Sequence, residues 1–124
     1  MQRMHAFDVL GDPVRRRILQ LLAEGELTSG AIAAVVQAEF RISQPAVSQH
    51  LKVLRENGFA TVRPEGTRRL YAVDAAPIRE VDDWIDPFRR FLDQRLDSLA
   101  TELARGKRER RLDATPTPRG DRNR

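Results

Sequence analysis

The segment Ser43–Gly58 reads as one short amphipathic helix with marked ends. Val47, Leu51 and Leu54 recur at spacings of four and three, which puts their side chains on one face of a helix. The first residue of the segment can cap the leading amides, and Asn57-Gly58 tolerates the left-handed conformation in which helices commonly end. The pattern therefore predicts a well-delimited helix that lies with one side on a core.

The other faces of this helix carry uncharged hydrogen-bonding side chains and one lysine, at Ser43, Gln44, Ser48, Gln49 and Lys52. Such side chains meet base edges and phosphates in the major groove of DNA. By itself the pattern is more typical of an ordinary amphipathic helix with a polar outside, so the flanking sequence has to decide between the two.

Composition limits the remaining possibilities. The 124 residues fit one domain, and 40% hydrophobic with 32% charged residues predicts a modest core of the kind that a partner subunit often completes. The absence of cysteine excludes disulfides, thiolate metal sites and cysteine nucleophiles. We find no leader-like or membrane-spanning apolar run, which favours a cytoplasmic protein.

The net charge of +4 comes from the end of the chain. Residues 1–104 hold 14 Lys and Arg against 15 Asp and Glu, whereas residues 105–124 hold 8 against 3. The high isoelectric point is therefore weak support for a basic domain. Local charge is more informative, because basic residues outnumber Glu56 and Glu65 between Ser43 and Arg69.

Two further helices are predicted ahead of the polar-faced one. Asp12 and Pro13 form a cap and first turn for a helix whose three arginines, Arg15–Arg17, are expected to be solvated, with a phosphate contact as the alternative. Thr28 or Ser29 starts the next helix, which runs on to about Arg41. A helix, a short connector and then the polar-faced helix follow one another in the order of a helix-turn-helix.

After Gly58 the pattern changes from helical to alternating. Residues 59–63 and 70–73 suit two strands joined by a turn that contains Pro64, Glu65 and Gly66. The hairpin carries Arg63, Arg68 and Arg69 near its tip, where they would reach backbone phosphate or the minor groove. A charged hairpin that only maintains solubility is the alternative.

A long apolar stripe follows from Ala75 onward, at alternating spacings of three and four. It is wider than the preceding elements need, so a second copy of the chain is the expected partner, and folding back on the chain's own core is the alternative. Pro87 is expected to kink or divide this helix. The residues expected at the dimer interface are Phe7, Ile78, Val81, Ile85, Phe88, Leu92, Leu96 and Leu99.

The sequence thus predicts a mostly α fold with a small β-hairpin, a winged helix-turn-helix that is dimeric through terminal helices. Its expected divisions are residues 1–74 for the DNA-binding core, 75–104 for the dimerisation helix or helices, and 105–124 for a disordered basic tail.

The segments FDVLGDPVRRRILQLLAEGELTSGAIA and ISQPAVSQHLKVLRENGFATVRPEGTRRLYAVD resemble the ArsR/SmtB family of winged helix-turn-helix repressors. The resemblance covers roughly the first three quarters of the chain. It implies a homodimer whose two recognition helices read an inverted repeat in double-stranded DNA. The residues expected to contact DNA are Ser43, Gln44, Ala46, Ser48, Gln49, His50, Lys52, Arg63, Arg68 and Arg69.

Two departures from the family pattern matter. About four additional residues, among Gln37–Arg41, precede the polar-faced helix and leave its angle open. The family's cysteine-containing metal motif is replaced by Glu26–Ser29, and the only histidines are His5 and His50, so the chain resembles the subgroup without a metal site. We therefore predict no metal, no cofactor and no metal sensing.

The main hypothesis is a sequence-specific dimeric repressor released from its operator by an unidentified small-molecule effector. A nonspecific or architectural DNA-binding protein is one alternative, and a winged-helix protein-interaction domain is another. An enzyme is not expected, because the chain lacks a phosphate-binding glycine loop and a nucleophile-base set.

Overall fold

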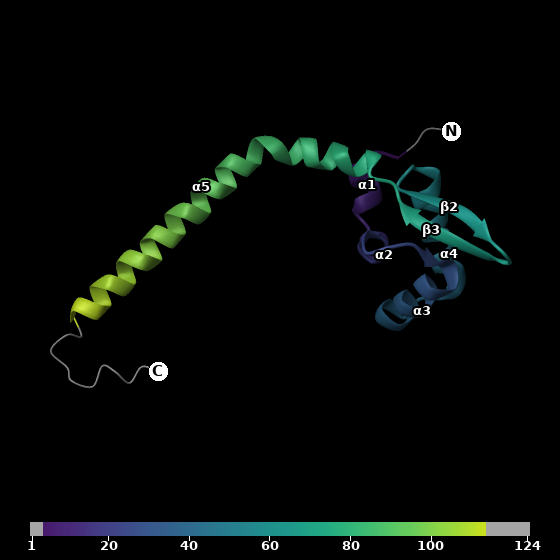
Figure 1. The fold of residues 1–124 in the computed structure, drawn as a ribbon, viewed down its shortest axis with the longest axis horizontal. Coiled ribbons are helices and arrows are strands. Elements are labelled where there is room, and N and C mark those ends of the chain that lie inside the picture. Colours follow the sequence, from purple (N-terminus) through teal and green to yellow (C-terminus); the bar gives the residue numbers. More distant parts are fainter. Residues whose placement is uncertain (1–3, 114–124) are drawn as a thin grey trace. The chain divides into compact units, whose positions relative to one another are not determined.

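The computed structural model describes residues 4–113, with side chains to residue 110. Within this range the chain forms helices and one small sheet (Figure 1). In chain order these elements are α1 (Ala6–Leu10), α2 (Pro13–Ala23), β1 (Leu27–Thr28), α3 (Ser29–Phe40), α4 (Gln44–Glu56), β2 (Ala60–Glu65), β3 (Arg68–Val73) and α5 (Ala76–Asp113).

The contacts within the chain divide it into two units, Met1–Trp84 and Ile85–Arg124. The first turns of α5 thus belong to the same compact unit as the helices and the sheet. Val81 packs against the core, and the Trp84 ring meets the Phe7 ring edge to face with centroids 5.2 Å apart. These contacts hold the start of α5 on α1.

The helix starts are fixed by the side chains that the sequence singles out. The Asp12 carboxylate accepts hydrogen bonds from the amides of Val14 and Arg15, at 2.8 and 3.1 Å. The Thr28 and Ser43 hydroxyls accept from the third amide along, in Ala31 and Ala46. Because each cap satisfies an amide that has no partner inside its helix, α2, α3 and α4 begin where the sequence predicts.

The sheet differs from the prediction in two ways. It has three strands in the order β1-β3-β2, because Leu27–Thr28 pairs with Tyr71 and Leu70 of β3. The hairpin strands are also longer than predicted, since Pro64 and Glu65 pair with Arg69 and Arg68 and leave only Gly66-Thr67 in the turn. Proline is tolerated there because β2 is an edge strand. Gly66 takes a positive φ of 64°, as a two-residue hairpin turn requires.

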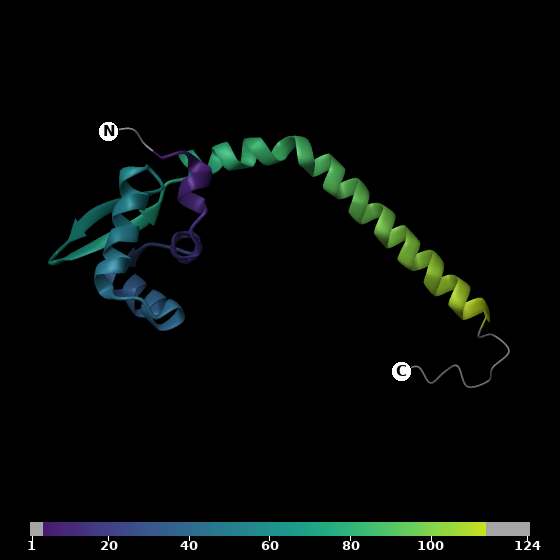
Figure 2. The same cartoon turned by 180° about the vertical axis from the view of Figure 1, so that it is seen from behind.

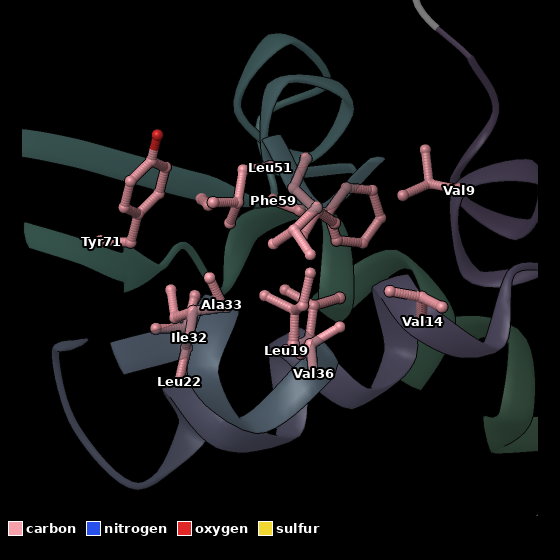
Figure 3. Packing of buried hydrophobic residues seen from close by; sticks show 14 of the residues in the cluster. Val9, Val14, Leu19, Leu22, Ile32, Ala33, Val36, Leu51, Phe59 and Tyr71 are labelled. Atoms are coloured by element: carbon pink, nitrogen blue, oxygen red, sulfur yellow. The ribbon is translucent and has the colours of Figure 1, made fainter. Parts of the chain in front are cut away.

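The core lies in the first unit, between the helices and the sheet. Val47, Leu51 and Leu54 of α4 are buried as the helical spacing predicts, with exposed fractions of 1%, 4% and 0%. Figure 3 shows Phe59, just ahead of β2, among side chains from the surrounding helices. In both overall views α4 lies against the β2–β3 hairpin, which it contacts through β2 (Figures 1 and 2).

The last helix corrects the sequence-based prediction at two points. α5 is one continuous helix through Pro87, so a division into two helices is wrong. It also continues past Ala104 to Asp113, because Arg, Lys, Glu and Leu favour a helix enough to carry it through Gly106. Residues 114–124 of the predicted tail lie outside the described residues. In the described part of the chain, no helix is long and apolar enough to cross a membrane.

Helix, connector, second helix and an antiparallel hairpin in this order make a winged helix-turn-helix. The predicted winged helix-turn-helix is confirmed, with α3 as the first helix of the pair, α4 as the second and β2–β3 as the wing, and dimerisation through terminal helices stays a prediction.

Candidate nucleic-acid interface

The outward side of α4 is a continuous polar surface. Gln44, Ser48, Gln49 and Lys52 are all exposed, while the apolar stripe of the same helix is buried. Ser43 is exposed as well, but its hydroxyl already caps the helix by accepting from the Ala46 amide at 3.2 Å. The helix therefore presents amide and hydroxyl groups of the kind that recognise base edges, on a backbone fixed by the core.

Two of the residues predicted to contact DNA lie deeper. Ala46 is half-buried, and His50 has a side chain that is only 19% exposed. Its Nδ1 lies 3.4 Å from Nη1 of Arg15 and 4.0 Å from Oδ1 of Asp12, so the ring joins α4 to the start of α2. A phosphate contact by His50 stays a prediction, and the contacts described add a role in holding α4 in place.

Asp12 is the charged centre of this contact. Partial burial acts to raise its pKa, but the amide hydrogen bonds from Arg15 and Val14, together with the charges of His50 and Arg15, outweigh it. The pKa of Asp12 therefore lies below its ordinary value of 3.8. The carboxylate is held in its charged form, which suits both the cap and the ion pair.

The arginines of α2, predicted to be a solvated face, include an exposed Arg16, but all three guanidinium groups also have partners within the chain. Arg15 donates to the carbonyls of Val9 and Asp8, at 2.8 and 3.2 Å, and Arg16 donates to the Leu10 carbonyl at 2.7 Å. These carbonyls lie at the end of α1, where helix carbonyls lack partners. The guanidinium groups thus close the end of α1, which the sequence could not reveal because the acceptors belong to the backbone.

Arg17, the third of these arginines, holds the end of α3, where the sequence predicts an additional turn. Its guanidinium donates to both carboxylate oxygens of Glu39, at 2.8 and 2.9 Å, and the hydrogen bond from Arg17 holds the pKa of Glu39 below its usual range. The Gln37 side-chain amide donates to the Ile42 carbonyl at 3.3 Å. These contacts connect the additional turn to α2 and to the connector before α4.

Two of the three arginines of the wing form ion pairs within the chain. Arg63 donates to both carboxylate oxygens of Glu26, at 2.9 and 3.3 Å, and lies 3.8 Å from Glu65. Arg68 is 3.3 Å from the same Glu65. Arg69 is exposed, and the described residues offer it no ion-pair partner.

The cations left for an external anion are accordingly a different set from the predicted one. Between residues 4 and 74, the exposed lysine and arginine side chains with neither an ion pair nor a hydrogen bond to another described residue are Arg41, Lys52, Arg55 and Arg69. Arg41 and Arg55 are absent from the predicted set. The sequence does not predict which arginines stay unpaired, because that depends on which carboxylates the fold places beside each of them.

The residues expected at a dimer interface are mostly exposed in the single chain. Exposed fractions are 41% for Phe7, 37% for Ile78, 44% for Phe88, 49% for Leu92, 63% for Leu96 and 52% for Leu99. Val81 and Ile85 are half-buried, and Val81 lies on the chain's own core. Within residues 4–113, no group of three or more histidine, aspartate or glutamate side chains is placed to hold a metal ion.

Comparison with known proteins gives consistent matches. Residues 10–63 match the family model of a helix-turn-helix domain. The chain is 40% identical over 83 residues to the HTH-type transcriptional regulator Rv2034 of Mycobacterium tuberculosis, covering 67% of this chain and 74% of that protein. It is 33% identical over 93 residues to the arsenical resistance operon repressor of Staphylococcus xylosus, covering 75% of each.

Solved structures agree with these matches. A crystal structure of an ArsR family transcriptional regulator, RHA00566, superposes with a TM-score of 0.59 at 25% sequence identity. The superposition covers 72% of this chain and 88% of that one. The similarity therefore extends over most of this chain and of the neighbour.

Proposed function

Since the chain belongs to the ArsR family of helix-turn-helix transcriptional regulators and is a DNA-binding repressor of that type, we propose that it works as a homodimer on an inverted-repeat operator. In this proposal α4 is the recognition helix, and each copy of the chain places one α4 in the major groove. Occupancy of the operator then blocks transcription.

The observation that carries the proposal is the division of α4 into two faces. One face is fixed in the core by three almost fully buried side chains, and the other presents Gln44, Ser48 and Gln49 to solvent. Glutamine can make paired hydrogen bonds with adenine, and serine can bond to several bases. A rigid helix with such side chains is suited to reading sequence, because direct readout needs donors and acceptors at fixed positions.

The same face argues against nonspecific binding as the main function. Proteins that bind DNA regardless of sequence rely on charge and on apolar wedges in the minor groove. The exposed face of α4 is mostly uncharged up to Lys52 and carries no large apolar side chain. A winged-helix interaction domain that does not bind DNA is also disfavoured. The exposed cations near α4 match the negative charge of DNA phosphates, so DNA binding explains them directly.

The proposed homodimer rests on the apolar side chains of α5. Phe88, Leu92, Leu96 and Leu99 repeat at spacings of four and three, and all are at least 44% exposed in the single chain. Such a stripe buries its apolar surface when a second helix packs on it. On DNA, the two copies of α4 in such a dimer would occupy successive major grooves on one face of the duplex, which are about 34 Å apart.

Relief of repression requires a ligand that binds the free protein better than the DNA-bound one. A hollow of about 480 Å³ joins the end of α4 to the start of α5 and is lined by Asn57, Asp74 and Glu80, among others. We propose it as the place for an unidentified small-molecule effector, since a ligand there would contact both helices. Because the partner is genomic DNA, we propose the cytoplasm as the site of action.

The proposed function is tested by a mobility shift with the DNA upstream of the chain's own reading frame, at two salt concentrations and with random duplex as competitor. A discrete complex that survives the competitor and contains two chains is the expected result, because base contacts add to the salt-dependent phosphate contacts. Binding that the competitor abolishes would support the nonspecific alternative, and no binding at either salt would contradict the proposal.

A further inference from the structure

We propose that Arg41, on the additional turn between α3 and α4, holds a phosphate of the DNA backbone beside the groove that α4 occupies. The inference rests on the proposed function and extends it by assigning a task to the additional turn. It also adds a source of backbone affinity besides Arg63 and Arg68, whose guanidinium groups already pair with Glu26 and Glu65.

The turn that carries Arg41 is tightly fixed. The Arg41 amide donates to the Gln37 carbonyl at 2.9 Å, which closes the end of α3. Glu39 binds Arg17 of α2 through both carboxylate oxygens, and the Gln37 side chain donates to the Ile42 carbonyl. A residue held from both sides offers its side chain from a defined position, which lowers the entropic cost of binding an anion.

The backbone of Arg41 is unusual for its residue type. Its φ of 56° and ψ of 44° lie in the left-handed region. Among the described residues, Arg41 alone takes a positive φ without being a glycine. Helices usually end in this conformation with glycine or asparagine, because a larger side chain brings its Cβ close to the backbone. Local stability alone would therefore favour glycine here. The arginine side chain must serve some purpose beyond ending the helix.

The exposed guanidinium of Arg41 is also uncommitted. Among residues 4–74, Arg15, Arg16, Arg17, Arg63 and Arg68 all bind carbonyls or carboxylates of the protein. No described residue does so for Arg41, although Glu39 lies only two positions away and instead binds Arg17. An external anion is the natural partner for a charge that the fold leaves open.

Arg41 lies close to the start of α4 along the chain. Arg41 precedes the cap residue Ser43 by two positions, so their Cα atoms are at most about 7 Å apart. The base-reading residues of a recognition helix lie in its first turns, and the phosphates that flank the groove lie beside them. A long side chain just ahead of the cap is thus within reach of the backbone while Gln44 meets the bases.

The test uses three substitutions that separate charge from backbone conformation. Arg41→Gly and Arg41→Asn suit the left-handed conformation and remove the charge, and Arg41→Lys keeps the charge. Thermal unfolding of each variant checks the fold. Binding to the operator and to random duplex is then measured across a salt series for the full chain.

We expect Arg41→Gly and Arg41→Asn to unfold at or above the wild-type temperature and yet to bind both duplexes about tenfold or more weakly. The slope of log K against log salt should fall by about 0.9 for each copy of the chain on the DNA, with Arg41→Lys near the wild type. Wild-type affinity and slope in the glycine variant would overturn the inference. No operator binding by the wild type would instead overturn the proposed function.

Discussion

Arginines in the first unit fall into two groups that the sequence does not distinguish. Arg15, Arg16 and Arg17 close the end of α1 and hold α3, whereas Arg69 extends from the wing without an ion pair to any described residue. A charge already paired within the protein must lose that partner to bind a phosphate, so it contributes less to DNA affinity. We therefore expect the arginines without a partner in the fold to contribute most to DNA affinity.

Arg69→Ala is expected to weaken binding to all DNA sequences alike and to reduce the salt slope by about 0.9 for each copy bound. Arg68→Ala is the matched control, since Arg68 is the preceding residue and is also exposed but lies 3.3 Å from the Glu65 carboxylate. It should change the slope less. Titrations over a salt series check both variants, and equal effects would contradict the division of the arginines.

Asp12→Asn is expected to lower the free energy of unfolding at pH 7 by about 0.3–1 kcal/mol, because asparagine keeps the cap but loses the charge at the helix start. The pKa of Asp12 is lower in the folded chain, so its contribution is fully present above the ordinary value of 3.8. That contribution is lost as the pH falls through the folded pKa.

The difference between wild type and Asp12→Asn should consequently shrink in acid, measured by urea unfolding at pH 7 and pH 3. Asp8→Asn is a suitable control, as Asp8 is an exposed carboxylate on the neighbouring α1. A difference that stays constant between the two pH values would show that the charge of Asp12 does not stabilise the fold.

The sequence predicts which polar residues of the candidate site are exposed, but not which partners its charged residues bind. The spacing of Val47, Leu51 and Leu54 identifies which side of α4 is buried, and the exposed side follows from it. The commitment of Arg63 to Glu26 does not follow, because 37 residues separate the two in sequence and β1 brings them together. His50 likewise meets Arg15 from 35 residues away.

At the scale of elements, local signals fixed most of the fold. Caps at Asp12, Thr28 and Ser43 mark the starts of three helices, and each cap acts within a few residues of its own position. The strand β1 was missed because it has two residues and exists through pairing with β3, a contact across more than 40 positions. Its signal is tertiary, so no local pattern contains it.

The recognition helix supplies the prediction at this scale. Gln44→Ala is expected to relax the base preference by about 1–3 kcal/mol at one position of each half-site, because a paired hydrogen bond to a base edge is lost. Binding to random duplex should hardly change. The preference is measured by competition among operators substituted one base pair at a time.

Gln20→Ala is the matched control for Gln44→Ala, since Gln20 is an exposed glutamine on α2. It should leave the preference at every base pair unchanged. An unaltered preference in Gln44→Ala would remove this residue from the reading surface.

For the whole molecule, the apolar stripe of α5 is the feature that a single chain leaves unexplained. Leu96 and Leu103 are 63% and 61% exposed, which is unfavourable for large apolar side chains in water. The spacing predicts the stripe, but the helix runs past residue 104, where the sequence predicts a disordered tail. Helix-forming residues on both sides of Gly106 carry α5 to Asp113.

Leu92→Asp combined with Leu99→Asp is expected to give monomers in light scattering, because two charges would have to be buried in the proposed seam. Gln94→Asp with Ser98→Asp adds the same charges at exposed polar positions of α5 and should leave the dimer intact. The monomeric variant should also lose operator affinity. A dimer of unchanged mass in the leucine variant would place the interface elsewhere.

Selection of duplexes from a random library by the full chain tests whether α4 reads DNA sequence in a twofold arrangement. Sequencing of the bound pool is expected to yield one inverted repeat, with half-site centres about 10 base pairs apart. A pool that stays random after repeated selection, although bound at low salt, would contradict it.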